Sequence, residues 1–356
     1  MGAAGLPFGR YLLGDRLAVG GMGEVYVAVQ RGMGDFEKPL AVKLLLPHLA
    51  EDPAAVAEFL NEARVASRLS HPNVVQIFDV GQEGGRYYLA MELVRGISLS
   101  GLLERLSARG EQLPASLVGF IAHGLLDGLH HAHELQDKEG KTVGLVHRDV
   151  SPHNVLVSVS GEVKLCDFGI ARAQDTRSST RTGAVKGKPA YLAPELFEGL
   201  SASRSTDVYA AAITIFQLAT GRSPFRRETD AATMRAVMTD ALPVMGRDDL
   251  PPTLEQAVSW GASRDALQRA PTALVLREAI PVTYGTGAAR ELGELVTAIA
   301  AEQVQSIESR AQQTAQLART STQQATGSAV VVEAPPRRSR LPLVAGLAVV
   351  VLGFGA

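Results

Sequence analysis

The chain has little cysteine and almost no net charge. Its 356 residues include a single cysteine, Cys166, and the formal net charge is −2. One cysteine forms neither an intrachain disulfide nor a thiolate metal cluster, which fits a reducing compartment. Balanced charge argues against a nucleic-acid partner bound through a general basic surface. The opening MGAAGLPFGRYLL lacks the basic start and long apolar core of a signal peptide. The length leaves room for one large domain with appendages.

The most informative stretch is Val146–Gly169, which reads VHRDVSPHNVLVSVSGEVKLCDFG. The apolar-alternating runs VLVSV and VKLC predict two short strands joined by a turn at Ser160–Gly161. Asp149 and Asn154 precede the first strand, and Asp167 follows the second. The ends of one hairpin therefore bring two carboxylates and one amide toward a single point. Such a group suits a hydroxyl-activating base beside oxygen ligands for a hard cation such as Mg²⁺.

Three features upstream are ordinary when taken singly. Leu12–Val29 places a glycine cluster between two β-prone runs, and glycines let backbone N–H groups approach phosphate oxygens. Lys43 ends the apolar run Ala41-Val42-Lys43. Pro53–Leu69 has the apolar periodicity of an amphipathic helix and carries Glu62. The alternative interpretations are a hairpin turn for the glycine cluster, a solvated edge lysine for Lys43 and a surface glutamate for Glu62.

In their order and spacing these elements resemble those of the protein kinases. The hairpin is similar to the catalytic loop H-R-D-x-x-x-x-N and the D-F-G element, and the glycine cluster to G-x-G-x-x-G-x-V with Ala18 in the first glycine position. Eight such elements follow one another from about Phe8 to Ile280. The segments GGMGEVY and YLAPE are most similar to the corresponding motifs of the bacterial Hanks-type (eukaryotic-like) serine/threonine kinases.

The resemblance implies an α+β, two-lobed fold. Residues 8–282 would form the kinase domain, with a β-rich N-lobe containing helix C at about 8–93 and a mainly helical C-lobe at about 94–282. Residues 283–336 would be a juxtamembrane helix, with a stripe of Leu292, Leu295, Val296 and Ile299, followed by a linker rich in Gln, Thr, Ser and Ala. Residues 341–356, uncharged and apolar after three arginines at 337–340, would be a transmembrane segment, either truncated or lying in a thinned bilayer.

The resemblance also implies the roles of the site residues. Asp149 would accept or orient the hydroxyl proton, Asn154 and Asp167 would hold Mg²⁺ (or Mn²⁺), and Lys43, paired with Glu62, would hold the phosphates of ATP. Met91 would be the gatekeeper, and the backbone of Glu92 to Val94 would pair with adenine. The implied ATP-site residues are Leu17, Ala18, Val19, Gly20, Gly21, Met22, Gly23, Glu24, Val25, Ala41, Lys43, Met91, Glu92, Val94 and Leu156.

One position departs from the family pattern. Ser151 stands two residues after Asp149, where serine/threonine kinases usually carry a lysine. The threonine that this lysine usually contacts, before P-x-Y in the activation segment, is here Lys188. The two chemical groups are exchanged, so we expect Lys188 to reach back to Ser151 and to supply the missing positive charge. Two coincidental substitutions are the alternative.

The resemblance predicts regulatory and structural contacts as well. The Ser/Thr/Arg-rich segment after Asp167 would be the activation segment, phosphorylated at Thr180 or Thr182 and paired then with Arg148. A linker that is never phosphorylated is the alternative. Asp207 would hold the catalytic-loop backbone, and Arg269 would form a buried ion pair with Glu195. The histidines at 123, 130, 131 and 133 are interpreted as helix-surface residues.

These observations give one expectation and its rivals. The chain is expected to be a serine/threonine kinase acting in bacterial signalling on protein substrates, single-pass in the cytoplasmic membrane with its kinase domain in the cytoplasm. A homodimer for trans-autophosphorylation is compatible with this. A membrane-tethered pseudokinase scaffold, a small-molecule kinase and a tyrosine kinase are the rivals. The loop after Asp149 lacks the Ala-Ala-Arg wording of tyrosine kinases.

Overall fold

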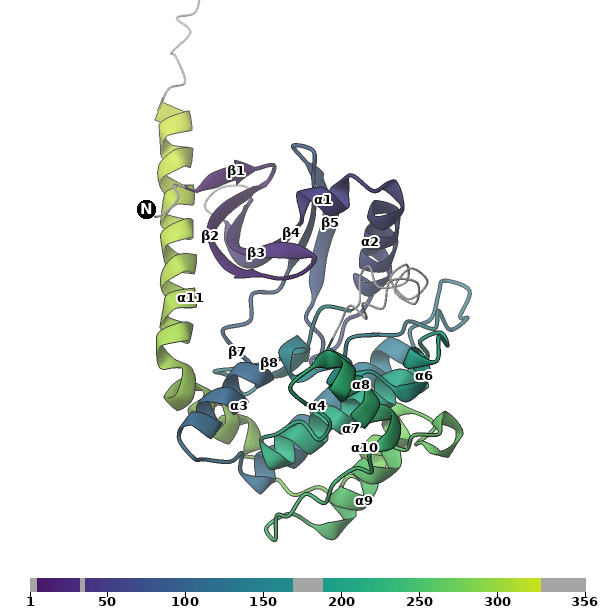
Figure 1. The fold of residues 1–356 in the computed structure, drawn as a ribbon. Coiled ribbons are helices and arrows are strands. Elements are labelled where there is room, and N and C mark those ends of the chain that lie inside the picture. Colours follow the sequence, from purple (N-terminus) through teal and green to yellow (C-terminus); the bar gives the residue numbers. More distant parts are fainter. Residues whose placement is uncertain (1–4, 33–35, 169–187, 328–356) are drawn as a thin grey trace, which may run out of the picture. The chain divides into compact units, whose positions relative to one another are not determined.

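The chain folds into two lobes, an upper one built on a sheet and a lower one built mainly of helices (Figure 1). The computed structural model describes residues 5–32, 36–168 and 188–327. Residues 1–319 form one unit and residues 320–356 a second. Every contact discussed below lies in the first unit. The two-lobed α+β architecture predicted from the sequence is confirmed.

The N-lobe is a six-stranded antiparallel sheet with one long helix beside it. Its strand order is β1-β2-β3-β4-β6-β5. The strands are β1 (Leu6–Phe8), β2 (Tyr11–Val19), β3 (Gly23–Arg31), β4 (Glu37–Leu45), β5 (Ile77–Glu83) and β6 (Arg86–Met91), and the helices are α1 (Pro47–Ala50) and α2 (Pro53–Ala66). Asp52 caps α2, since its side chain accepts a hydrogen bond from the N–H of Ala54 at 2.9 Å. Lys43 lies in the interior of the sheet, paired with Val25 on one side and Leu89 on the other.

The C-lobe is organised around two buried helices, α4 (Ala115–His133) and α7 (Arg204–Thr220). A capping box of Ser203 and Thr206 begins α7, and Gly221, in the left-handed region with φ 73°, ends it. The other helices are α3 (Leu99–Ala108), α6 (Pro194–Phe197), α8 (Asp230–Thr239), α9 (Pro252–Gly261), α10 (Ala273–Ala279) and α11 (Ala288–Gly327), with 3-10 turns η1 (Pro152–Asn154), η2 (Pro189–Tyr191) and η3 (Ala266–Gln268).

Two of the four histidines of α4 are not on the surface, and the sequence interpretation is wrong for them. His123 and His133 are 2% and 1% exposed. The ring of His123 is hydrogen-bonded to the hydroxyl of Tyr284 at 2.7 Å, and that of His133 to the carboxylate of Asp207 at 2.9 Å. A polar ring is buried here because each has a partner.

A second, three-stranded antiparallel sheet lies in the C-lobe. It consists of β7 (Gly96–Ser98), β8 (Val155–Ser158) and β9 (Val163–Leu165). Strands β8 and β9 are the hairpin predicted from the sequence, and Gly161 in their turn has φ 78°. A side chain there would also clash, because a Cβ would lie 1.7 Å from the carbonyl oxygen of Ala289 at the start of α11.

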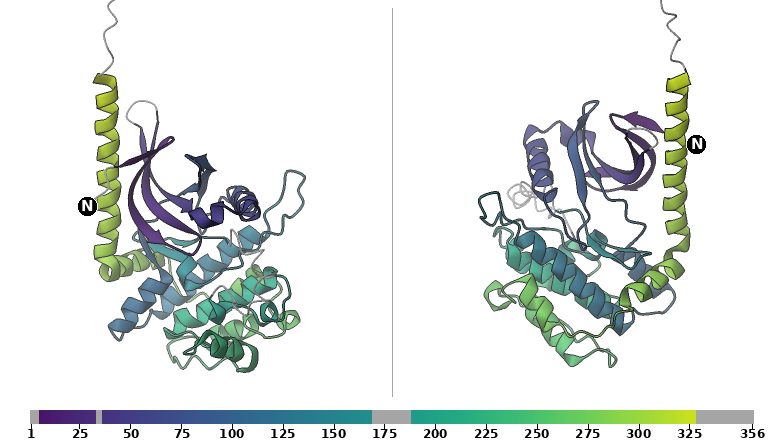
Figure 2. Two further views of the ribbon diagram at one scale, coloured as in Figure 1. Left: turned by 45° about the horizontal axis from the view of Figure 1, so that its top comes forward. Right: turned by 180° about the vertical axis from the view of Figure 1, so that it is seen from behind.

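Helix α11 differs most from the sequence prediction. It is one element with a kink at Ala300. Its first arm carries the predicted stripe, of which Leu292, Val296 and Ile299 are buried in the C-lobe core. Its second arm, predicted to be a linker, is helical instead, and as far as Arg319 it runs beside the N-lobe (Figures 1 and 2).

Among residues 5–32, 36–168 and 188–327, no helix is long and apolar enough to span a lipid bilayer. The transmembrane segment predicted at 341–356, and the arginines before it, lie outside the described residues.

Candidate active site

The ends of the β8–β9 hairpin bring the three predicted catalytic and metal-binding side chains together. The side-chain nitrogen of Asn154 donates to the carbonyl oxygen and to the Oδ2 atom of Asp149, both at 2.8 Å. The N–H of Cys166 donates to the carbonyl oxygen of Asn154 at 2.9 Å, which places Asp167 beside Asn154. With its nitrogen held by Asp149, Asn154 is left with its side-chain oxygen for a cation. A carboxylate and an amide oxygen fit the ligand preference of Mg²⁺.

Lys43 reaches from β4 to this hairpin. Its amine lies 2.5 Å from Oδ1 of Asp167. Burial by itself raises the pKa of Asp167, but the charge of Lys43 and its hydrogen bond outweigh this effect and hold that pKa below its usual value. Asp167 is therefore ionised at neutral pH, as a metal ligand must be. The side chain of Glu62, the predicted partner of Lys43, lies outside what the structure describes.

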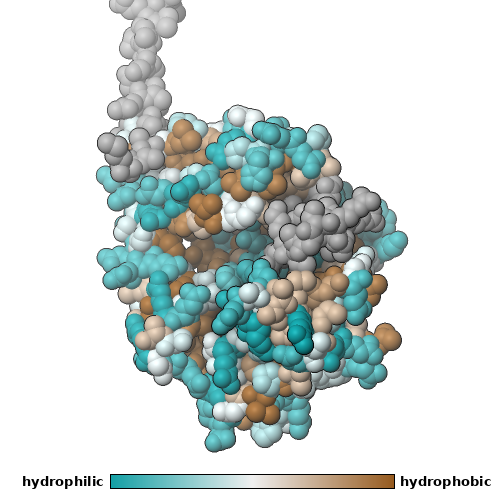
Figure 3. Space-filling model, in the orientation of Figure 1, coloured by the Kyte–Doolittle hydropathy of each residue, from teal (hydrophilic) through white to brown (hydrophobic). Residues whose placement is uncertain are grey.

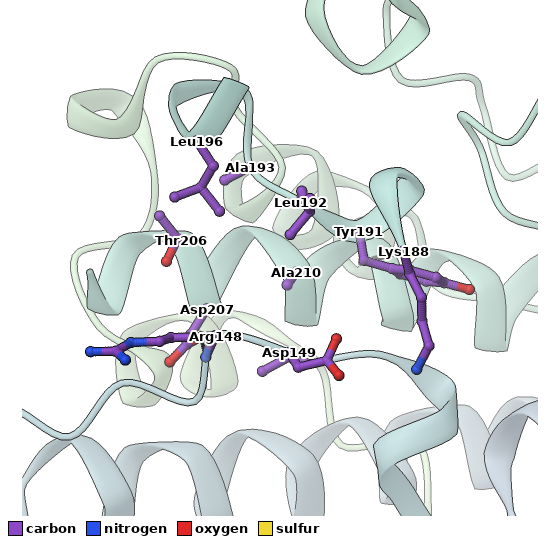
Figure 4. Close-up of a pocket in the computed structure, with 11 residues that line it drawn as sticks. Arg148, Asp149, Lys188, Tyr191, Leu192, Ala193, Leu196, Thr206, Asp207 and Ala210 are labelled. Atoms are coloured by element: carbon purple, nitrogen blue, oxygen red, sulfur yellow. Dashed lines mark hydrogen bonds between the residues drawn. The ribbon is translucent and has the colours of Figure 1, made fainter. Parts of the chain in front are cut away.

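The backbone around the site is held in an unusual conformation. Among the described non-glycine residues, those with positive φ are Arg148 (66°) and Asp167 (55°). Such a conformation persists where neighbouring groups fix it. Here the carboxylate of Asp207 accepts the N–H groups of Arg148 at 2.9 Å and of His147 at 2.7 Å. The predicted role of Asp207, holding the catalytic loop, is confirmed, and Figure 4 shows its carboxylate against Arg148.

His147 fixes the two ends of the hairpin to each other. It is fully buried, and its ring is hydrogen-bonded to the carbonyl oxygen of Cys166 at 3.0 Å and to the N–H of Asp149 at 3.2 Å. Its ring also packs on that of Phe168, with 4.5 Å between the centroids. Burial lowers the pKa of His147, so the ring stays neutral and its Nδ1 remains an acceptor. Sequence reasoning missed this positioning role, and that of His133 on Asp207, although His147 opens the H-R-D motif.

A cavity of about 610 Å³ lies between the lobes. Eight of the predicted ATP-site residues line it: Leu17, Ala18, Val25, Ala41, Met91, Glu92, Val94 and Leu156. Asp167 lines it too, so the cavity reaches the catalytic hairpin. Val19, Gly20, Gly21, Met22, Gly23, Glu24 and Lys43 are not among the described residues that line it. Glu24 pairs instead with Arg16 at 2.5 Å on the surface of the sheet.

The β2–β3 hairpin tolerates Ala18 but requires Gly23. Ala18 pairs with Val25 in the β2–β3 ladder and is not among the described residues with positive φ. An alanine therefore fits in place of the usual first glycine. A Cβ on Gly23 would lie 2.5 Å from the carbonyl oxygen of Leu44, a contact that real Cβ atoms do not make. The N–H of Gly20 donates to the carbonyl of Gly23 at 2.8 Å and closes the turn.

Lys188 contacts Ser151, as the exchanged positions predict. Its amine donates to the hydroxyl of Ser151 at 3.1 Å, and Ser151 is fully buried. In Figure 4 the side chains of Asp149 and Lys188 extend into the same space. Thr180 and Thr182, and with them the predicted pairing of Arg148, lie outside the described residues.

The predicted ion pair of Arg269 with Glu195 is present and bidentate. The two guanidinium–carboxylate distances are 2.6 and 2.7 Å, and the side chain of Arg269 is 0% exposed. Arg269 also donates to the backbone carbonyl oxygens of Ser263 and Arg264. It therefore joins α6 to the segment before α10.

Comparison with known proteins agrees with this geometry. Residues 11–312 match the protein kinase domain family. The chain is 38% identical to the tyrosine-protein kinase MasK of Myxococcus xanthus (77% of this chain, 43% of that protein) and 34% identical to the serine/threonine-protein kinase PrkC of Bacillus subtilis (74% and 39%). It is also 34% identical to the serine/threonine-protein kinase PknA of Mycobacterium tuberculosis (70% and 56%). It spans about two fifths to just over half the length of these relatives.

A crystal structure of the M. tuberculosis PknI kinase domain superposes with a TM-score of 0.57 at 27% identity, over 84% of this chain and 99% of that one. The matched family extends past 282, where the sequence placed the end of the domain, into α11. From the catalytic hairpin, the cavity between the lobes and the match over residues 11–312, the chain belongs to the protein kinase family.

Proposed function

We propose that the chain is an ATP-dependent kinase that phosphorylates serine and threonine hydroxyls of proteins in bacterial signal transduction. The observation that carries the proposal is the convergence of Asp149, Asn154, Asp167 and Lys43 at the catalytic hairpin, whose Asp167 lines the cavity between the lobes. Phosphoryl transfer depends mainly on positioning and charge stabilisation, and this group of side chains supplies both.

Each side chain has one task in the proposed reaction. Asp149, oriented by Asn154, accepts or orients the proton of the attacking hydroxyl. Asn154 and Asp167 would hold Mg²⁺, which when bound neutralises charge on the phosphates. Lys43 would exchange its present partner, Asp167, for the phosphates of ATP. The proposed pairing of Glu62 with Lys43 and the proposed phosphorylation at Thr180 or Thr182 rest on the sequence alone.

The choice of hydroxyl is the point on which the relatives differ. Two of the three relatives described above are named serine/threonine kinases, and the third is named a tyrosine kinase. The catalytic loop, Asp149-Val-Ser-Pro-His-Asn, lacks the Ala-Ala-Arg wording of the tyrosine branch. Incubation of the purified chain with labelled ATP and Mg²⁺, followed by phosphoamino-acid analysis, is expected to give phosphoserine and phosphothreonine. Phosphotyrosine alone would contradict the assignment, and no label at all would favour the pseudokinase scaffold.

Lys188 is proposed to supply the positive charge that a lysine at position 151 usually provides. Its amine contacts Ser151 and extends into the space next to Asp149. It therefore lies close enough to contact a phosphate brought to Asp149. The complete set of Lys43, Asp149, Asn154 and Asp167, with this relocated lysine, favours an enzyme over a pseudokinase.

Exchanging the two residues tests this role. Lys188→Thr and Ser151→Lys are each expected to lower kcat about 10- to 100-fold, since one removes the charge and the other places two ammonium groups together. The double variant Ser151→Lys/Lys188→Thr restores one lysine and one hydroxyl, so its kcat is expected to recover to within a few-fold of wild type. Lys138→Thr, on an exposed loop, is the control. A double variant no better than the single ones would contradict the proposal.

Membrane attachment through residues 341–356, with the kinase domain in the cytoplasm, is proposed from the sequence alone. The apolar run follows Arg337, Arg338 and Arg340, and cytoplasmic flanks are enriched in basic residues. Carbonate extraction of membranes from cells that express the chain tests it, since a peripheral protein is released and an inserted one is retained.

A homodimer for trans-autophosphorylation is a further proposal. Measurement of the molecular mass in solution at micromolar protein concentration tests it.

A further inference from the structure

The second arm of α11 lines the cavity between the lobes. Its contributing residues are Gln303, Ser306, Ile307 and Arg310. Their spacing of i, i+3, i+4 and i+7 puts them on one face of the helix. The cavity that they border is the one lined by the predicted ATP-site residues, and a hollow between the lobes is visible in Figure 3.

This part of α11 is held on both sides of the cavity. Toward the C-lobe, Arg105 donates to the side-chain oxygen of Gln303 at 2.9 Å. Next to the segment that connects the lobes, Arg95 pairs with Glu308 at 3.3 Å. Toward the N-lobe, Arg310 donates to the carbonyl oxygen of Arg16 at 3.0 Å. The helix therefore joins the two lobes beside the cavity.

Farther along, α11 packs closely on β2. The hydroxyl of Thr314 occupies the space of a missing side chain, since a Cβ on Gly14 would lie 2.0 Å from it. Ala318 forms a buried apolar cluster with Leu12 and Val29. Exposed ion pairs contribute little by themselves. The close fit at Gly14 and the apolar cluster show that the helix packs against a complementary surface of the N-lobe.

The helix borders the cavity without filling it. With α11 in place the cavity still measures about 610 Å³, inside the usual range for small-molecule sites. The contacts of α11 also place its cavity-lining residues at one end of the cavity. Arg95 follows Val94, whose backbone is predicted to pair with adenine, and Arg16 precedes Leu17, another predicted ATP-site residue. The ion pair of the catalytic lysine with its aspartate marks the phosphate end instead.

We propose that Ser306, Ile307 and Arg310 of α11 are part of the nucleotide site, where they contact the nucleoside rather than the phosphates. Ile307 offers apolar surface, and Ser306 and Arg310 offer polar groups for sugar hydroxyls or a purine edge. Nucleotide binding and the packing of α11 on the N-lobe are then thermodynamically coupled, so that each stabilises the other. This inference rests on the proposed function, because it takes the ligand to be ATP.

Binding measurements on the full chain test the proposal. The dissociation constants of ADP with Mg²⁺ and of adenosine would be measured by calorimetry for wild type, Ile307→Ala and Ile307→Ala/Arg310→Ala. Both ligands are expected to bind about tenfold more weakly to the double variant and by the same factor, because the lost contacts are to the nucleoside. Gln305→Ala and Gln312→Ala, exposed on the other side of the same helix, are expected to bind as wild type does.

A second measurement needs no substitution. Hydrogen exchange of the wild-type chain is expected to slow in residues 303–319 when ADP is added. Unchanged affinity in the double variant with unchanged exchange would overturn the proposal and leave the kinase assignment intact. Tighter binding in the double variant would also overturn it, because α11 would then obstruct the site. A wild-type chain that binds neither ADP nor ATP would refute the proposed function itself, and this inference with it.

Discussion

Replacing Asp149 by asparagine is expected to lower the rate of phosphoryl transfer by about 10²–10⁴-fold. The amide has nearly the same shape as the carboxylate, but it neither accepts the hydroxyl proton nor carries charge. Asn154 still has an oxygen to donate to, at the position that Oδ2 of Asp149 now occupies. The loop should therefore keep its conformation while the base is lost. Transfer of labelled phosphate from ATP, measured at saturating ATP, gives the rate.

Two controls separate chemistry from binding and folding in this experiment. The affinity for ADP is expected to change less than about threefold, because Asp149 binds the hydroxyl and not the nucleotide. Asp248→Asn, on an exposed loop, changes the same charge without touching the site and is expected to be as active as wild type. Normal phosphorylation by Asp149→Asn would show that another group is the base.

The variant Lys43→Met is also expected to lose most of its kinase activity, because the contact of the lysine amine with the phosphates is lost.

The largest loss of stability is expected from Arg269→Leu. Removing one partner of a buried ion pair commonly costs about 3–5 kcal/mol, because the other charge is left buried without compensation. Arg269 is fully buried, holds both oxygens of Glu195 and donates to further backbone carbonyls. Domains of this kind are stable by only about 5–15 kcal/mol. Urea unfolding of the variant, compared with wild type, is therefore expected to show a large fall in the free energy of unfolding.

The double variant Glu195→Gln/Arg269→Leu shows whether the unpaired charge is the cause. With the carboxylate neutralised, part of the lost stability is expected to return, so the double variant should be more stable than Arg269→Leu. Arg222→Leu, on the exposed turn after α7, is the matched control and is expected to change stability by less than about 0.5 kcal/mol. A loss below about 1 kcal/mol in Arg269→Leu would mean that the pair is not a major contributor to stability.

Much of the catalytic centre follows from the sequence, because local rules place it. Alternating apolar residues and a glycine turn make the β8–β9 hairpin, and the polar residues at its ends must then converge. The exchange of Ser151 and Lys188 could be predicted across the chain because two departures from one pattern complement each other chemically. The positioning roles of His133 and His147 are harder to predict, since the sequence does not show whether a histidine ring will have a buried hydrogen-bond partner.

The order of the elements, the two-lobed fold and the identity of the groups at the catalytic hairpin can all be predicted from the amino-acid sequence. The course of α11 beyond Ala300, by contrast, is evident only in three dimensions. The side chains on its packed face are mostly small or polar, so the segment has no apolar stripe and its composition is that of a linker. Its burial depends on the partner surface: Gly14 leaves room for Thr314, and Arg16 offers a carbonyl to Arg310. Complementarity of this kind exists only when two distant segments meet, and no periodicity within either segment encodes it.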